Sequence, residues 1–176
     1  VMRITRQRLV KLMTGPPKKP EDDEKAVRQL MDGDAYRIVS GGTSANIVSR
    51  ILGKKITDVS EQTPAPDIPP IARIEGIDLT TEGVLTLSHA IDLLKRYANN
   101  EDDDAFYNDL DQKNGSAMIA SVLIEDCTDL EIILGTAVNA AHQNPSLSFS
   151  LHARNQLAGQ LKQLMEQMGK RVTVTY

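Results

Sequence analysis

The sequence predicts an α/β fold in which helices cover both faces of a mainly parallel, doubly wound sheet, a three-layer, Rossmann-like arrangement. The first observation is that strand-like and helix-like segments alternate about five times along the chain, an order typical of a parallel sheet. The second is that parallel strands need right-handed crossovers, which favour the doubly wound topology. The 176 residues are expected to form one domain over positions 1–176, because this length is long for one domain and short for two.

The first half of the chain contains three predicted strands and two predicted helices. In the first helix, acidic residues at 21–24 fill the first turn, where the helix dipole favours negative charge. Its apolar residues follow helical spacing, and Gly33 ends it. The second helix covers residues 45–52 and ends at Gly53. The strands are expected at residues 9–13, 36–39 and 55–59.

The second half of the chain is expected to begin with an extended loop, since residues 60–70 contain four prolines. A helix follows residues 81–83, because Leu87, Ile91 and Leu94 lie on one helical face. Short strands are expected at 71–74 and 77–80, an acidic loop at 99–104, a buried helix at 116–125 and a buried strand at 130–134. A long loop at 135–150 is followed by a last helix and by a final strand at 171–176. The apolar stripe of the last helix consists of Leu157, Leu161, Leu164, Met165 and Met168.

The charge and hydropathy of the chain argue against two classes of partner. The formal net charge is −4, whereas binding to nucleic acid needs a concentrated positive face. We interpret the one basic cluster, Arg3, Arg6, Arg8 and Lys11, as a solvated strand face. No apolar run approaches the roughly 20 residues that span a bilayer. We therefore expect neither nucleic acid nor a membrane as a partner.

The cysteine content and the first residue indicate the setting of the chain. Cys127 is the single cysteine, so it forms no internal disulfide and suits a reducing compartment. No signal peptide is recognisable, and a cytoplasmic location is expected. Because the sequence begins with Val1 rather than Met, we expect it to be a piece of a longer protein.

The strongest candidate binding segment follows the second predicted strand and opens a helix. Paired glycines let backbone approach a ligand closely, and the free N–H groups of a first helical turn attract an anion. The segment matches neither a P-loop nor a dinucleotide fingerprint, and a tight turn with a capping hydroxyl is the alternative interpretation. The candidate ligand-binding residues here are Gly41, Gly42, Thr43, Ser44 and Asn46.

Two later loops are expected to meet the same edge of the sheet. In the first, Thr81 accompanies Asp78 and Glu82, which could bind a cation or ribose hydroxyls, or could be a strand-edge acid and a turn acid. In the second, Asn139 and His142 follow a buried strand. His142 could donate to a phosphate, act as an acid or base, or hold its own turn. A metal site normally has more converging ligands than these two loops provide. We therefore assign no metal site and no catalytic residue.

Three motifs resemble a bacterial protein family. They lie at residues 14–17 (TGPP), 39–47 (VSGGTSANI) and 75–87 (EGIDLTTEGVLTL). They are similar to the C-terminal part of phosphatases related to stage II sporulation protein E. Residues 139–145 and 169–174 are similar as well, so the likeness covers most of the chain.

The resemblance implies a domain that accompanies a metal-dependent serine/threonine phosphatase domain. In that family the metal-binding aspartates lie in the preceding domain. The Asp-Gly and Asp-Asp motifs of that site are not matched here, because Asp32-Gly33 ends a helix and Glu82-Gly83 has Glu in place of Asp. The resemblance therefore carries no catalytic residue onto this chain.

Three functional hypotheses fit these observations. The leading one is a regulatory domain that binds a small anionic molecule, a nucleotide or a phosphorylated metabolite, at the Gly41–Ser44 segment, beside a phosphatase domain of the parent chain. The second is a metal-dependent phosphatase that uses Asp78, Glu82 and His142. The third is a structural or dimerisation module in which the last helix and strand pair with another copy to form a homodimer. The sequence identifies no cofactor.

Overall fold

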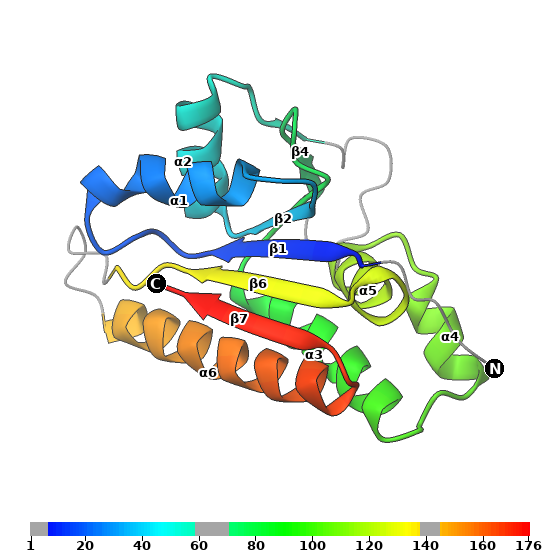
Figure 1. Cartoon of the computed structure of the whole chain (residues 1–176). Coiled ribbons are helices and arrows are strands. Elements are labelled where there is room, and N and C mark those ends of the chain that lie inside the picture. The colour runs from blue at the N-terminus through cyan, green and yellow to red at the C-terminus, as the bar shows by residue number, and fades with distance from the viewer. Residues whose placement is uncertain (1–6, 59–70, 138–144) are drawn as a thin grey trace.

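The fold is an α/β sandwich around one twisted sheet. The computed structural model describes residues 7–58, 71–137 and 145–176. Within these residues helices lie on both faces of a seven-stranded sheet (Figure 1), which confirms the predicted three-layer, Rossmann-like class. The strands run in the spatial order β3 (Thr57–Asp58), β4 (Ile71–Arg73), β5 (Leu79–Thr81), β2 (Tyr36–Ser40), β1 (Leu9–Thr14), β6 (Asp129–Leu134) and β7 (Arg171–Thr175).

The sheet is doubly wound about its central strand, β1. Strands β5, β2, β1, β6 and β7 are all parallel, whereas β4 pairs antiparallel with both β3 and β5. The chain first builds outward from β1 through β2 to β5 and then crosses to the other side of β1 to add β6 and β7. The strand order therefore reverses between β1 and β6, and the carboxyl ends of five strands share one edge.

The helices divide between the two faces of the sheet. Helices α1 (Asp23–Met31) and α2 (Gly42–Leu52) pack against each other on one face. The longer helices α3 (Val84–Ala98) and α6 (Pro145–Gln167) cover the opposite face together with α5 (Gly115–Ser121). A short helix, α4 (Asp104–Leu110), rests on α3 and α5 through the buried ring of Phe106. The two helical layers and the sheet between them thus make up the three layers of the fold.

Alternation along β1 supplies apolar groups to both layers. Val10 and Leu12 belong to the larger core beneath α3 and α6, and Met13 belongs to the smaller core beneath α1 and α2. This arrangement follows from the two-residue period of a strand, which sends successive side chains to opposite faces. Because β1 is central, both faces of it are covered, as the near-continuous apolar run of a parallel strand requires.

Two helical segments differ from the sequence-based expectation. The loop expected at 135–150 is shorter, because α6 begins at Pro145, a residue favoured in the first helical turn. The acidic loop expected at 99–104 leads directly into α4, where the Asp103 side chain accepts a hydrogen bond from the Phe106 backbone N–H at 2.8 Å. An aspartate of the expected acidic loop is thus a helix N-cap.

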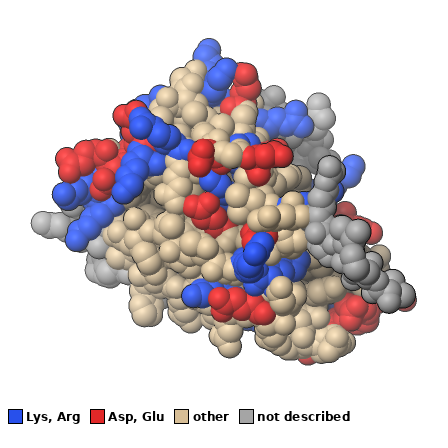
Figure 2. Space-filling model, viewed as in Figure 1, with Lys and Arg blue, Asp and Glu red and all other residues tan. Residues whose placement is uncertain are grey.

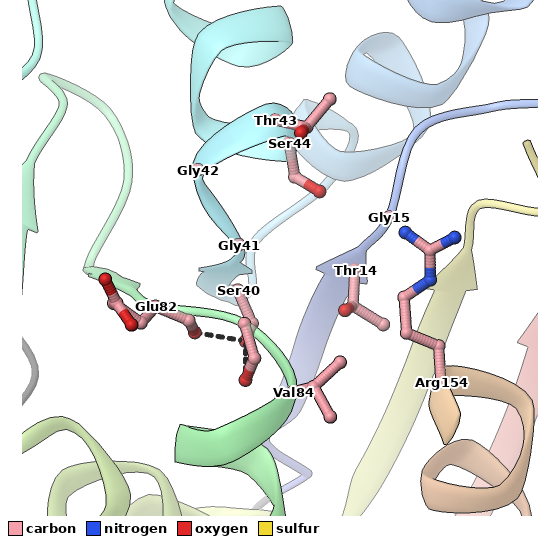
Figure 3. A pocket seen from close by; sticks show the side chains of 11 residues that line it. Thr14, Gly15, Ser40, Gly41, Gly42, Thr43, Ser44, Glu82, Val84 and Arg154 are labelled. Carbon is pink, nitrogen blue, oxygen red and sulfur yellow. Dashed lines mark hydrogen bonds between the residues drawn. The ribbon is translucent and has the colours of Figure 1, made fainter. Parts of the chain in front are cut away.

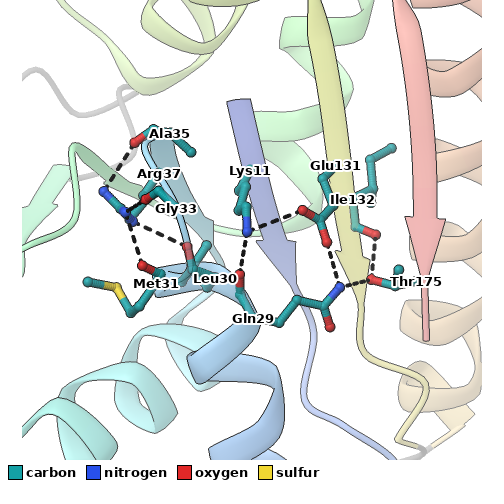
Figure 4. Close-up of polar contacts among 10 residues, drawn as sticks. All are labelled: Lys11, Gln29, Leu30, Met31, Gly33, Ala35, Arg37, Glu131, Ile132 and Thr175. Atoms are coloured by element: carbon teal, nitrogen blue, oxygen red, sulfur yellow. Dashed lines mark hydrogen bonds and ion pairs between the residues drawn. The ribbon is translucent and has the colours of Figure 1, made fainter. Parts of the chain in front are cut away.

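A polar network lies between α1 and the sheet (Figure 4). The Lys11 ammonium donates to the Gln29 carbonyl at 2.6 Å and lies 3.3 Å from the Glu131 carboxylate. The Gln29 side-chain amide donates to Glu131 at 2.5 Å and to the Thr175 hydroxyl at 2.9 Å. The network joins α1 to β1, β6 and β7. The Lys11 side chain is only 5% exposed, so its interpretation as part of a solvated strand face was wrong.

The face of the molecule seen in Figure 2 has no large patch of charge of a single sign. Acidic and basic side chains are interspersed there, most densely in the upper left of the view. Arg8, from the basic cluster of the sequence, pairs with Asp126, and Arg3 and Arg6 lie outside the described residues. In the described parts of the chain, no helix combines the length and the apolar character needed to cross a bilayer.

We predict that Glu131→Leu lowers the free energy of unfolding by about 2–3 kcal/mol, because it leaves the Lys11 ammonium buried without its carboxylate. The double variant Lys11→Met/Glu131→Leu should regain most of that loss, since two apolar groups replace the ion pair. Urea denaturation of the three proteins checks this. Equal destabilisation of the single and double variants would contradict the role given to the ion pair.

Candidate functional site

A cavity of about 300 Å³ opens at the carboxyl edge of β1, β2 and β5 (Figure 3). It receives residues from the turns after these three strands and one side chain from α6. The lining residues are Thr14, Gly15, Ser40, Gly41, Gly42, Thr43, Ser44, Glu82, Gly83, Val84 and Arg154. The predicted convergence of glycine-bearing turns at this edge is therefore present for the turns after β2 and β5.

The turn after β2 is fixed by backbone contacts to the turn after β5. The Gly41 N–H donates to the Thr81 carbonyl at 2.9 Å, and the Ser40 hydroxyl donates to the Glu82 carbonyl at 2.8 Å. Gly41 has φ 112°, in a region that disfavours any side chain. A Cβ on Gly83 would lie only 3.5 Å from the Gly41 Cα. The two turns therefore abut backbone to backbone.

The N-terminus of α2 opens into the cavity, and its first-turn N–H groups have no acceptor within the helix. Gly41 is the N-cap residue and carries no side chain that could accept from the first turn. Its carbonyl accepts from the Ala45 N–H at 2.9 Å, which begins the helical hydrogen bonds. The N–H groups of Gly42, Thr43 and Ser44 are thus the orphan donors of the first turn. Together with the helix dipole they favour an anion.

Ser44 places a buried hydroxyl at this N-terminus. Its exposed fraction is 1%, and among the residues that the structure describes its Oγ has no hydrogen-bond partner. Figure 3 shows this oxygen directed into the cavity, towards the side where Gly15 and Arg154 lie. A buried hydroxyl without a partner costs about 1–3 kcal/mol of free energy. This position therefore favours a ligand that accepts a hydrogen bond from the hydroxyl.

Arg154 brings a positive charge to the cavity from α6, across the sheet from α2. A Cβ on Gly15 would lie 2.7 Å from its Nη1, and its Nη2 donates to the Ala137 carbonyl at 3.1 Å. Burial lowers the pKa of Arg154, yet a guanidinium stays charged at neutral pH. No carboxylate of the described residues forms an ion pair with it. Residues 138–144, which lead into α6, contain no Asp or Glu.

The structure brings five of the ten predicted site residues to the cavity. They are Gly41, Gly42, Thr43, Ser44 and Glu82. Thr81 supports them from below, since its carbonyl accepts from Gly41 and its hydroxyl donates to the Glu82 carbonyl. Asn46 is exposed on α2 and is not part of the lining. Asn139 and His142 lie outside the described residues.

Asp78 lies at the opposite edge of the sheet. Its carboxylate accepts from the Arg37 backbone N–H at 2.7 Å, at the start of β2. Because β5 separates Asp78 from Glu82, the two acids are about 13 Å apart along the strand. The proposed convergence of Asp78 with Glu82 is corrected accordingly, and Asp78 is the strand-edge acid of the alternative interpretation. The described residues contain no group of three or more His, Cys, Asp or Glu suited to a metal ion.

Arg154 is not among the ligand-binding residues predicted from the sequence. Its signal is positional, because Arg154 lies three, four and seven residues before Leu157, Ala158 and Leu161, on the stripe that packs against the sheet. A charged residue on an apolar stripe indicates a cavity or a partner at that level of the helix. Thr14 and Gly15, which are not among the predicted ligand-binding residues, also line the cavity, and Gly15 lies beside Arg154.

Comparison with known proteins assigns no family to the chain. No family model, no curated protein and no solved structure matches it. The resemblance to phosphatases related to stage II sporulation protein E therefore stays an expectation from the motifs, and the site stands on its geometry.

The crevice between β1 and β6, where the strand order reverses, is closed. The Gly135 N–H donates to the Thr14 carbonyl at 2.9 Å, and the Ala137 N–H donates to the Pro16 carbonyl at 3.1 Å. A Cβ on Gly135 would overlap the carbonyl groups of Gly15 and Pro16. The loops after β1 and β6 thus continue the pairing of their strands. The cavity described above lies towards β2 and β5, and a second cavity of about 260 Å³ lies on the α1 side of these loops, beside Gly135 and Tyr176.

We predict that Gly135→Ala lowers the free energy of unfolding by about 2–3 kcal/mol, because backbone on both sides leaves no room for a methyl group. Gly159→Ala is the matched control, since no atom lies within 4 Å of a Cβ there. In the interior of α6 that change should stabilise the protein by about 0.5–1 kcal/mol. Thermal and urea unfolding measure both, and a Gly135→Ala protein as stable as the parent would contradict the closed crevice.

Cys127 is unsuited to act as a nucleophile. Burial raises the pKa of its thiol to about 11, and the nearby Lys170 ammonium opposes this shift only in part. Lys170 instead donates to the carbonyl groups of Leu123, Ile124 and Cys127 at 2.6–2.7 Å. It therefore stabilises the end of the π-helical turn Val122–Asp126.

We predict that the native protein reacts slowly with iodoacetamide at pH 8. With a pKa of about 11 instead of 9.0, the thiolate fraction of Cys127 is roughly 100-fold lower at that pH. Mass spectrometry should show alkylation in 6 M guanidinium within minutes and almost none in the folded protein. Above pH 9 the raised pKa disfavours the folded state, because only the unfolded chain then releases the proton readily. Comparable native and denatured rates would contradict the burial.

Proposed function

We propose that the chain is a binding domain for a small anionic molecule, a nucleotide or a phosphorylated metabolite, held at the N-terminus of α2. One observation carries the proposal. The Arg154 guanidinium and the uncapped first turn of α2 face each other across one cavity (Figure 3). The guanidinium and the positive end of the helix dipole repel each other. An anion bound between them is attracted to both and removes this repulsion.

The buried Ser44 hydroxyl supports the same conclusion. A phosphate or carboxylate oxygen accepts from a hydroxyl and from backbone N–H groups with equal ease, and charge-assisted hydrogen bonds are stronger than neutral ones. An anion in the cavity would give Ser44 Oγ and the first-turn donors their missing partners. Glu82, also in the lining, directs its carboxylate away from Arg154 (Figure 3). It is placed to accept from hydroxyl groups on the rest of the ligand.

The geometry favours binding over metal-dependent hydrolysis. The hydrolase hypothesis requires Asp78 and Glu82 to act together, and Asp78 is engaged with the Arg37 N–H at the other edge of the sheet. A regulatory role beside a phosphatase domain rests on the motif resemblance and remains a prediction. A cytoplasmic location, expected from the single cysteine, remains a prediction as well. Pairing of the last helix and strand into a homodimer likewise remains a prediction.

We predict that Arg154→Met weakens binding of inorganic phosphate about 10- to 100-fold, the loss expected for a charge-assisted hydrogen bond. Ser44→Ala should weaken it by a smaller factor, about 3- to 10-fold. Ser44→Ala should not destabilise the free protein, because Ser44 Oγ is buried without a partner among the described residues. Arg154→Met also removes the hydrogen bond from Nη2 to the Ala137 carbonyl, so it should cost about 1 kcal/mol of stability. Isothermal titration calorimetry gives the affinities, and thermal unfolding without ligand gives the stabilities.

Gly42→Asp and Gly42→Asn form the matched pair for this test. A Cβ on Gly42 would have no atom within 4 Å, so both variants should fold. An acid in the first turn suits the helix dipole but repels a bound anion, and only Gly42→Asp should abolish binding. A wild-type chain that binds neither phosphate, nucleotides nor phosphorylated metabolites would refute the proposed function.

A further inference from the structure

A second helix also begins at the cavity. Gly83 is the N-cap residue of α3, and Gly83 and Val84 both line the cavity. The Gly83 carbonyl accepts from the Leu87 N–H at 3.1 Å. The N–H groups of the three residues from Val84 to Thr86 are therefore the orphan donors of this helix. Among the described residues no side chain caps them.

Two of the helices that begin elsewhere, α4 and α5, are capped by side chains, whereas α1 has no side-chain cap and directly follows the 3₁₀ turn Pro20–Asp22. Asp103 accepts from the Phe106 N–H at 2.8 Å at the start of α4, and Asn114 accepts from the Ala117 N–H at 2.9 Å at the start of α5. The two helices that begin at the cavity both have glycine at this position. Among the described helices, the two with a glycine N-cap thus both begin at the cavity.

The two open N-termini are neighbours. A Cβ on Gly41 would lie 3.8 Å from the Gly83 Cα, and a Cβ on Gly83 would lie 3.5 Å from the Gly41 Cα. Helices α2 and α3 cover opposite faces of the sheet, so their positive ends approach the cavity from two sides (Figure 3). Ser44, buried without a partner among the described residues, marks the α2 side of this shared cavity.

We infer that the ligand carries two linked phosphates, as in a nucleoside diphosphate or another diphosphate ester. One phosphate binds the first turn of α2 with Ser44 and Arg154, and the second binds the first turn of α3. The reason is the charge balance, because each N-terminus is equivalent to about half a positive charge and Arg154 adds a full one. Glu82 offsets part of this charge, yet it makes no capping hydrogen bond to α3. This inference rests on the proposed function.

The test compares pyrophosphate with inorganic phosphate by calorimetry, with EDTA present and at about 0.15 M salt to screen non-specific attraction. The wild-type chain should bind pyrophosphate at least about tenfold more tightly than phosphate. Leu85, in the first turn of α3, is 57% exposed, so it accepts a polar replacement. Leu85→Asp should reduce the preference for pyrophosphate to about twofold or less, because its carboxylate repels the second phosphate. Leu85→Asn, the neutral match, should keep the preference.

The possible outcomes distinguish the second phosphate site from the proposed anion site at α2. If phosphate binds and pyrophosphate binds no more tightly, the second phosphate site is wrong and the anion site at α2 stands. If Leu85→Asp and Leu85→Asn reduce the preference equally, the charge at α3 is not its cause and the inference is overturned. If neither anion binds, the inference and the proposed function fail together.

Discussion

The site depends on the close contact between the turns after β2 and β5. Parallel pairing brings the carboxyl ends of these strands to one edge, and the hydrogen bond from the Gly41 N–H to the Thr81 carbonyl joins the two turns. Neither Gly41 nor Gly83 carries a Cβ, so their backbones touch. As a result, α2 and α3 begin side by side and then diverge over opposite faces of the sheet.

The backbone conformation of Gly41 explains why the first turn of α2 has no side-chain cap. Its φ of 112° is one that residues with a side chain rarely adopt. The orphan N–H groups, the Ser44 hydroxyl and Arg154 share one cavity, and the contacts within the described residues leave several of them without partners. Elsewhere, the Lys11, Gln29 and Glu131 network shows buried polar groups that are paired, whereas the hydroxyls of Thr80 and Thr86 also have no partner among the described residues. The proposed ligand site therefore rests on the open groups that gather in one cavity, and not on Ser44 alone.

Much of the fold follows from local patterns in the sequence. Apolar periodicity and glycine stops identified the parallel strands and the helices α1, α2, α3 and α6, since these signals are set by residues close in the chain. The N-cap role of Asp103 could not be predicted, because Asp103 lies in a run of similar acidic residues. The start of α6 at Pro145 could not be predicted either, because Pro145 lies in a polar segment.

The candidate site was predicted less completely, for a different reason. Gly41 to Ser44 could be selected because strand, glycine pair and helix start follow one another in the sequence. Arg154 could not be joined to them, because its approach to Gly15 depends on how α6 crosses the sheet. Asp78 was misplaced because a three-residue strand, β5, separates it from Glu82 and sends the two acids to opposite edges.

The closed crevice between β1 and β6 has a mechanical consequence. The loops after these strands are bonded to each other at Gly135 and Ala137, and a molecule in the cavity would lie beside this seam. It would touch α2, from the first half of the doubly wound sheet, and Arg154 on α6, from the second half. Such a molecule would therefore act as a removable clamp that holds the two halves of the chain together.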